Sequence, residues 1–121
     1  MNYENSMSSK SFKQITTDLN KGLATFRAAQ PETMAGFSAM AKAAMAPGVL
    51  SAIDKELIAL AIGVAARCDG CIGFHIKTLI KLGASKAHLD ETLAVAVYMG
   101  GGPSLMYAAE ATRAWEEFNT P

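Results

Sequence analysis

The chain has 121 residues, half of them hydrophobic and 18% charged, which suits one folded domain with a core but not two. Eleven basic and eleven acidic residues cancel, so no net charge would attract phosphate backbones or anionic lipid, and neither nucleic acid nor a membrane is an expected partner. The longest apolar stretch, residues 57–66, is too short to span a bilayer, and residues 1–11 lack the apolar centre of a signal peptide. We therefore expect a cytoplasmic protein.

The composition favours an all-α fold, because Ala and Met are plentiful and β-branched runs are scarce. Residues 1–10 show no periodicity and are predicted to be a flexible lead-in, followed by a single domain over residues 11–121. Apolar residues at helical spacing predict helices over about 12–29, 31–46, 52–66, 68–82, 86–99 and 104–118. The expected starts are the caps Ser11, Ser51 and Ser85 and the first-turn residue Pro31.

The predicted helix breaks are rich in Gly and Pro: Pro47-Gly48, Gly83 and the run Gly100-Gly101-Gly102-Pro103. A glycine run can also cradle phosphate at a helix N-terminus. Here no strand precedes the run and no Lys-Ser/Thr follows it, which favours a tight helix–helix turn. The third helix is apolar nearly all round after Glu56 and is predicted to be buried at the centre.

The only two cysteines, Cys68 and Cys71, are three residues apart at the start of the fourth predicted helix. That spacing places both sulfurs on one face, close enough to form a small disulfide ring. The free N–H groups and positive dipole end of a helix stabilise thiolate over thiol, and Arg67 would add to this effect. In a reducing compartment such a Cys-x-x-Cys pair indicates redox chemistry or metal binding.

His75 and Glu56 complete the candidate site. His75 lies four residues after Cys71 and therefore on the same stripe of the helix, where an imidazole can carry protons for the thiols. A histidine in that role needs a partner on its other ring nitrogen. If the third and fourth helices form an antiparallel hairpin, Glu56 lies beside His75 and supplies this partner.

Each residue also has an inert interpretation. The cysteines could be small buried hydrophobes, His75 a satisfied core histidine, and Glu56 an exposed charge at a helix N-terminus. Two thiolates, an imidazole and a carboxylate are also a plausible zinc set, although three of these ligands would crowd one helix turn. Ile72 after the second cysteine excludes covalent haem, and the lack of a βαβ pattern disfavours a thioredoxin fold. His88, among charged neighbours, is expected in solvent.

The segment from Glu56 to His75, followed by Gly83-Ala84 and residues 99–103, resembles the core of the carboxymuconolactone decarboxylase superfamily, in its alkylhydroperoxidase D-like branch. The resemblance spans about residues 50–109. It implies an antioxidant dithiol peroxidase without a metal or other cofactor. Its proton relay would run from Glu56 through His75 to Cys71 and Cys68. Its partners would be a hydroperoxide substrate and an external dithiol reductant of the thioredoxin-like or lipoyl type.

The resemblance also implies a homo-oligomer, a trimer or hexamer, and the very apolar third and fifth helices favour such an assembly. The position of Cys68 at the helix start favours a mechanism in which its thiolate attacks the peroxide and Cys71 then closes the disulfide, although the two sulfurs could exchange roles because His75 lies nearer Cys71. Alkylhydroperoxidase D has a second histidine where this chain has Gly70, so the level of peroxidase activity does not follow from the resemblance. Lactone-decarboxylating members lack the paired cysteines, which argues against that reaction here. A disulfide reductase and a metal-binding helical domain remain the alternatives.

Overall fold

The computed structural model describes residues 10–121, a part of the chain that forms six α-helices and no strand. The all-α prediction is confirmed. The predicted flexible lead-in lies outside the described residues, apart from Lys10. The helices are α2 (Phe12–Ala29), α3 (Pro31–Met45), α4 (Ala52–Ala65), α5 (Asp69–Lys81), α6 (Lys86–Gly100) and α7 (Gly102–Phe118).

Serine side chains cap three of the helices, as predicted. Ser11, Ser51 and Ser85 each accept a hydrogen bond from the backbone N–H three residues later. Asp54 completes a reciprocal capping box on α4, whereas the Gln14 side chain bonds Asp18 at 2.8 Å instead of returning to the cap.

The break between α6 and α7 is much shorter than the predicted four-residue run. Gly100 still belongs to α6 and Gly102 already belongs to α7. Only Gly101 leaves the helical path, with φ +70°, a conformation that favours glycine. Its N–H bonds the Val97 carbonyl, and its own carbonyl accepts from Leu105, so both helix ends keep their backbone hydrogen bonds.

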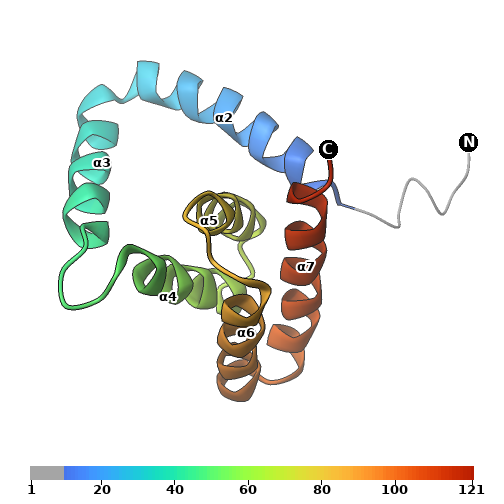
Figure 1. Ribbon diagram of the computed structural model, residues 1–121. Coiled ribbons are helices and arrows are strands. Elements are labelled where there is room, and N and C mark those ends of the chain that lie inside the picture. Colours follow the sequence, from blue (N-terminus) through green and yellow to red (C-terminus); the bar gives the residue numbers. More distant parts are fainter. Residues whose placement is uncertain (1–9) are drawn as a thin grey trace, which may run out of the picture.

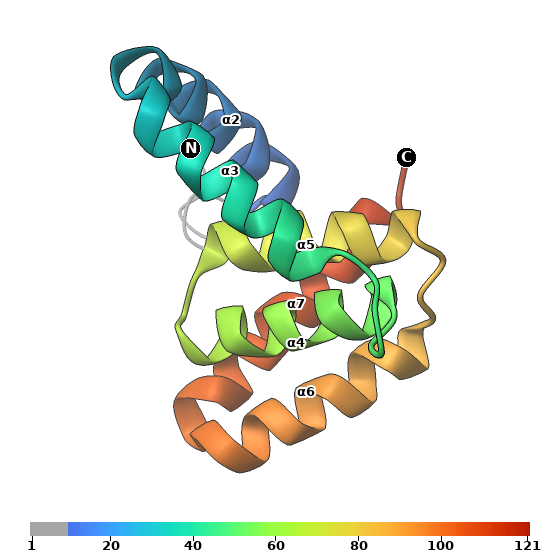
Figure 2. The ribbon, with the colours of Figure 1, turned by 90° about the vertical axis from the view of Figure 1, so that its left-hand side faces the viewer.

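Helix α5 lies at the centre, with α2, α4 and α7 packed around it (Figure 1), while α6 packs on α4 and α7. The view turned by 90° shows α4 and α5 stacked one above the other, with α6 beneath α4 (Figure 2). The largest fully buried aliphatic side chains come from α4, α5 and α6, namely Leu60, Val64, Ile72, Ile76, Leu79 and Leu89. Each contributes about 1.5–3 kcal/mol by leaving water, so the α4–α5 pair is held rigidly by this core.

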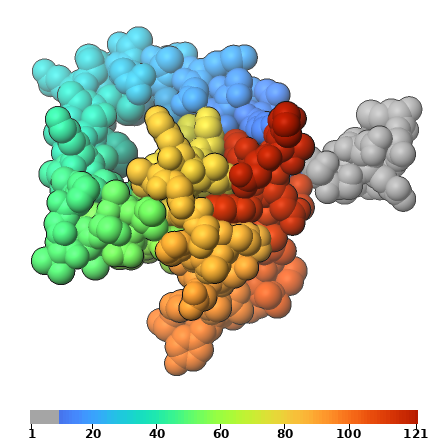
Figure 3. Space-filling model, viewed as in Figure 1, coloured from blue at the N-terminus to red at the C-terminus, as the bar shows by residue number. Residues whose placement is uncertain are grey.

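Helices α2 and α3 form an arm that bends at Gln30 and passes around α5 (Figure 1). The arm is anchored at its start, where Phe12 and Thr16 are buried, whereas α3 has no buried residue. At its far end the Lys55 amine donates to the carbonyls of Ala44 and Ala46, at 2.9 and 2.6 Å. Between α3 and α5 the space-filling view shows an opening (Figure 3).

The prediction that the third helix is buried all round is wrong for the single chain. Leu60 and Val64 are buried, but Ile58 and Ile62 on the other face of α4 are 49% and 64% exposed. One chain supplies neighbours for only part of this helix, so an apolar face remains uncovered. Within residues 10–121, no helix is both long and apolar enough to cross a membrane.

Candidate dithiol active site

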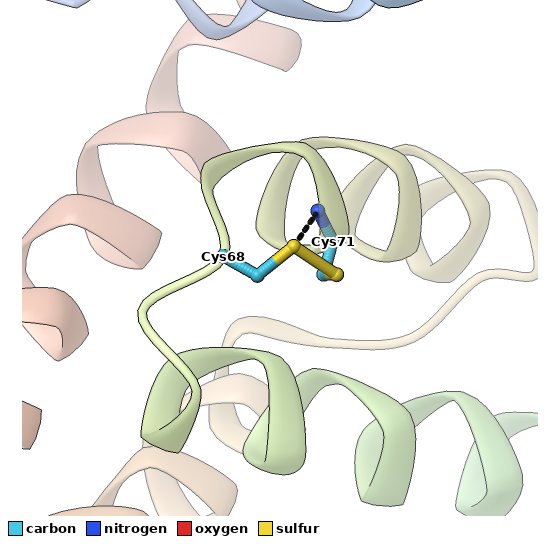
Figure 4. The surroundings of a disulfide bond; sticks show 2 residues. All are labelled: Cys68 and Cys71. Carbon is cyan, nitrogen blue, oxygen red and sulfur yellow. Dashed lines mark hydrogen bonds between the residues drawn. A yellow bond between two sulfur atoms is a disulfide. The ribbon is translucent and has the colours of Figure 1, made fainter. Parts of the chain in front are cut away.

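A tight turn between α4 and α5 presents the two cysteines. Arg67 adopts a left-handed backbone with φ +57°, and the next N–H, that of Cys68, returns to the Gly63 carbonyl at 3.0 Å. This geometry reverses the chain within three residues and starts α5 directly above the end of α4. Cys68 and Cys71 are joined by a disulfide, with their Cα atoms 5.2 Å apart (Figure 4).

Cys68 is the N-cap of α5. Its Sγ accepts a hydrogen bond from the Cys71 N–H at 3.2 Å, the role that a serine plays at the other helix starts (Figure 4). After reduction, the same N–H and the helix dipole would stabilise negative charge on this sulfur. The local geometry therefore favours a thiolate at Cys68 over one at Cys71.

Glu56 and His75 face each other across the α4–α5 hairpin. The Glu56 Oε2 lies 2.6 Å from the His75 Nδ1, and the two side chains are only 14% and 31% exposed. A carboxylate can only accept, so Nδ1 carries a proton and Nε2 remains for proton exchange. The hairpin thus brings together the pair proposed from the sequence, with a short and partly buried bond that fixes the imidazole orientation. The catalytic roles of both residues remain predictions.

Two glycines allow close packing around the cysteines. A Cβ on Gly63 would lie 2.9 Å from the Cys71 Cβ, so this glycine lets α4 approach the second cysteine. A Cβ on Gly70 would lie 2.6 Å from the Leu19 Cδ1 of α2. The position where alkylhydroperoxidase D carries its second histidine is therefore covered by a leucine, which would have to move for a larger side chain to fit.

The structure gives the other sequence candidates no bond to the dithiol among the described residues. His88 is exposed and caps α6, accepting the Ser85 N–H at 3.0 Å. Arg67 is also exposed, and its evident role is the left-handed turn. Over residues 10–121, no group of three or more His, Cys, Asp or Glu side chains is arranged to hold a metal ion.

Sequence reasoning missed Lys10, which it assigned to the lead-in. Its amine lies 3.2 Å from a carboxylate oxygen of Asp69, inside the Cys-x-x-Cys motif. No local pattern could have found this pair, because the two residues are 59 positions apart.

Comparison with known proteins decides the family. Residues 31–114 match the model of the carboxymuconolactone decarboxylase family. The chain belongs to this family. The match is consistent with the alkylhydroperoxidase D-like branch, and it includes the α4–α5 hairpin and both cysteines.

Two uncharacterized bacterial proteins resemble the chain over most of its length. An uncharacterized protein of Cupriavidus necator is 39% identical over 88% of this chain and 95% of its own length. An uncharacterized protein of the cox locus of Paracoccus denitrificans is 31% identical over 69% of this chain and 75% of its own length.

Two solved structures share the fold. A carboxymuconolactone decarboxylase family protein from Legionella pneumophila is 58% identical, with a TM-score of 0.88 over 90% of this chain and 97% of that one. A family protein from Thermotoga maritima, for which a part in the antioxidative response has been suggested, is 26% identical. Its TM-score is 0.76 over 84% of this chain and 87% of that one.

Proposed function

We propose that this protein is a dithiol peroxidase that reduces hydroperoxides with Cys68 and Cys71. The observation that carries the proposal is the short bond from Glu56 to His75 on the same helix that carries a cysteine pair at its N-terminus. A dithiol alone is a common redox group, whereas a dithiol with an oriented imidazole on the same helix has a means of moving protons. The suggested antioxidative role of the Thermotoga maritima relative agrees with this proposal.

The proposed reaction starts from the reduced protein, in which the Cys68 thiol gives its proton to the Nε2 of His75. The Cys68 thiolate attacks the terminal (OH) oxygen of the hydroperoxide, the O–O bond breaks to leave a sulfenic acid on Cys68, and the departing alkoxide takes that proton back from His75 to leave as alcohol. The Cys71 sulfur then attacks the Cys68 sulfenic acid, which forms the disulfide and releases water. In total, two thiols and one hydroperoxide give a disulfide, an alcohol and water. An external dithiol, from a thioredoxin-like protein or a lipoyl group, returns the two electrons by thiol–disulfide exchange.

The test is a stoichiometric oxidation of the reduced protein. One equivalent of tert-butyl hydroperoxide should consume both thiols and leave a Cys68–Cys71 disulfide, detected by thiol titration and peptide mass spectrometry. The reaction should be faster than that of free dithiothreitol at the same pH, because the helix start favours the thiolate. Thiols that stay free with tert-butyl, cumene and hydrogen peroxides would overturn the proposal.

A disulfide reductase is the second candidate, supported by the oxidised pair at a helix start. It predicts rapid reduction of the Cys68–Cys71 bond by a small dithiol and transfer of the electrons to a disulfide substrate. If the thiols did not react with peroxides but exchanged rapidly with the dithiol and the disulfide substrate, this function would be favoured over the peroxidase.

We also propose that the protein is a homo-oligomer, a trimer or hexamer. Support comes from the uncovered apolar face, where Ile62 on α4 and Val95 and Met99 on α6 are 64%, 61% and 76% exposed. A groove lined by Met45, Leu50 and the exposed face of α4 adjoins it. Light scattering should give a multiple of the chain mass, and Ile62→Lys should lower it. A monomer at micromolar concentration would contradict the assembly.

A further inference from the structure

A charged cluster links the start of the arm to the Cys-x-x-Cys motif. The Lys10 amine lies 3.3 and 3.2 Å from the two carboxylate oxygens of Asp69, and 3.9 Å from Glu110 on α7. The same amine lies 5.2 Å from the centre of the Tyr107 ring. Desolvation lowers the pKa of Lys10, but the bond to Asp69 and the charges of Asp69 and Glu110 outweigh it and hold this pKa above its ordinary value.

Asp69 occupies the first position of α5, between the two cysteines. A carboxylate there suits the helix dipole, but its negative charge also opposes formation of a thiolate on the same turn. A cation bonded to the Asp69 carboxylate offsets this negative charge and so favours the thiolate. Among the described residues, Lys10 is the cation bonded to it.

The other charges nearby are already paired or turned outward. Arg113 donates to both carboxylate oxygens of Glu110, at 3.4 and 3.0 Å. Arg67 is exposed, and the Glu56–His75 pair is bonded within itself. With Lys10 in place, the cluster of Asp69, Lys10, Glu110 and Arg113 carries no net charge, and without it one negative charge remains next to the dithiol.

We propose that Lys10 is a positioning residue of the dithiol site, which offsets the charge of Asp69 and thereby favours the reactive thiolate. This inference rests on the proposed thiol chemistry, but it concerns the ionisation of the sulfur and not the identity of the oxidant. It gives Lys10, 59 positions from Asp69 in sequence, a role in tuning the cysteines.

The test measures the alkylation of reduced Cys68 by iodoacetamide in a Cys71→Ser background. A unit charge about one helical turn away in a water-like dielectric changes an ionisation equilibrium about two- to threefold. We therefore expect Lys10→Met to slow alkylation about two- to threefold at a pH where the thiol is mostly protonated, and to raise the midpoint of its pH profile. Lys10→Arg keeps the charge and should restore the wild-type profile.

Lys13→Met is the matched control, since the Lys13 amine bonds the Thr120 carbonyl and not the motif. It should leave the profile unchanged. In about 1 M salt, where the screening length falls to about 3 Å, the Lys10→Met difference should largely vanish. A difference that persists in high salt, an equal effect of Lys13→Met, or a wild-type profile for Lys10→Met would each overturn the inference. Because no peroxide is used, failure here is distinguishable from failure of the peroxidase proposal.

Discussion

Glu117, near the C-terminal end of α7, clamps the start of the arm, and its removal is a direct test of how the arm is held. One carboxylate oxygen accepts from the Phe12 N–H at 2.7 Å, and the other accepts from the Ser11 hydroxyl at 2.7 Å and the Lys13 N–H at 3.2 Å. Two of the N–H groups that a helix start leaves unpaired are thus satisfied by a residue more than 100 positions away.

Glu117→Gln removes the charge and leaves one acceptor oxygen for three donors. By comparison with helix caps and hydrogen bonds to charged groups, we expect a loss of about 1–2 kcal/mol in the free energy of unfolding at pH 7. With an m-value of about 1.5 kcal/mol/M, the urea midpoint should fall by roughly 0.7–1.3 M at fixed protein concentration. Glu116→Gln is the control, because Glu116 is exposed beside it and its side chain makes no hydrogen bond among the described residues.

The pH dependence gives a second signature. Desolvation raises the pKa of Glu117, but the bonds from Ser11, Phe12 and Lys13 outweigh it and hold this pKa below its ordinary value of 4.5. The carboxylate therefore stabilises the fold fully above about pH 4.5 and loses this effect as the pH falls through the folded pKa. The difference in urea midpoint between wild type and Glu117→Gln should therefore shrink as the pH falls. Equal midpoints for the two Gln variants at pH 7, or a difference that does not change in acid, would refute the clamp.

Three further predictions concern the dithiol. Glu56→Gln should slow peroxide-driven thiol oxidation about tenfold without lowering the free energy of unfolding by more than about 1 kcal/mol, and unchanged kinetics would remove this residue from the relay. Gly63→Ala should also slow disulfide formation, because its Cβ would press on Cys71, whereas Gly36→Ala, with open space around it, should leave the rate unchanged. Cys71→Ser should consume one peroxide and accumulate sulfenic acid, while Cys68→Ser should react slowly at that step; mass spectrometry showing the opposite pattern would reverse the roles.

Much of the fold follows from local signals that the sequence states directly. Ser11, Ser51 and Ser85 mark helix starts because a serine oxygen satisfies a free N–H three residues on, whatever the rest of the fold does. The facing of Glu56 and His75 was predictable for a related reason. Two helices joined by a short turn must pack antiparallel, so residues at similar distances from the turn meet.

The predictions that failed depend on what lies across the fold. Ile62 is apolar in a mostly apolar helix, and nothing local says that no element of the same chain would cover it. The glycine run was expected to break the chain over four residues, but only Gly101 needs a left-handed φ, because a helix tolerates glycine where tertiary packing supports it. Such failures concern packing rather than propensity, and they point to the surfaces where a second chain would be needed.

The charged residues around the dithiol show why only part of the site could be predicted from the sequence. Helix α7 holds the backbone of the arm start through three contacts: Arg113 donates to the Lys10 carbonyl at 3.2 Å, and Glu117 accepts from the N–H groups of Phe12 and Lys13. The Lys10 side chain then reaches Asp69. The Glu56–His75 pair lies within one hairpin, whereas the charge balance that we propose for the cysteines would depend on a chain of contacts from the C-terminal helix. Glu117→Gln, which weakens the contacts that hold the arm start, should therefore disfavour the thiolate, as the loss of Lys10 would. The Glu56–His75 bond should stay intact in this variant.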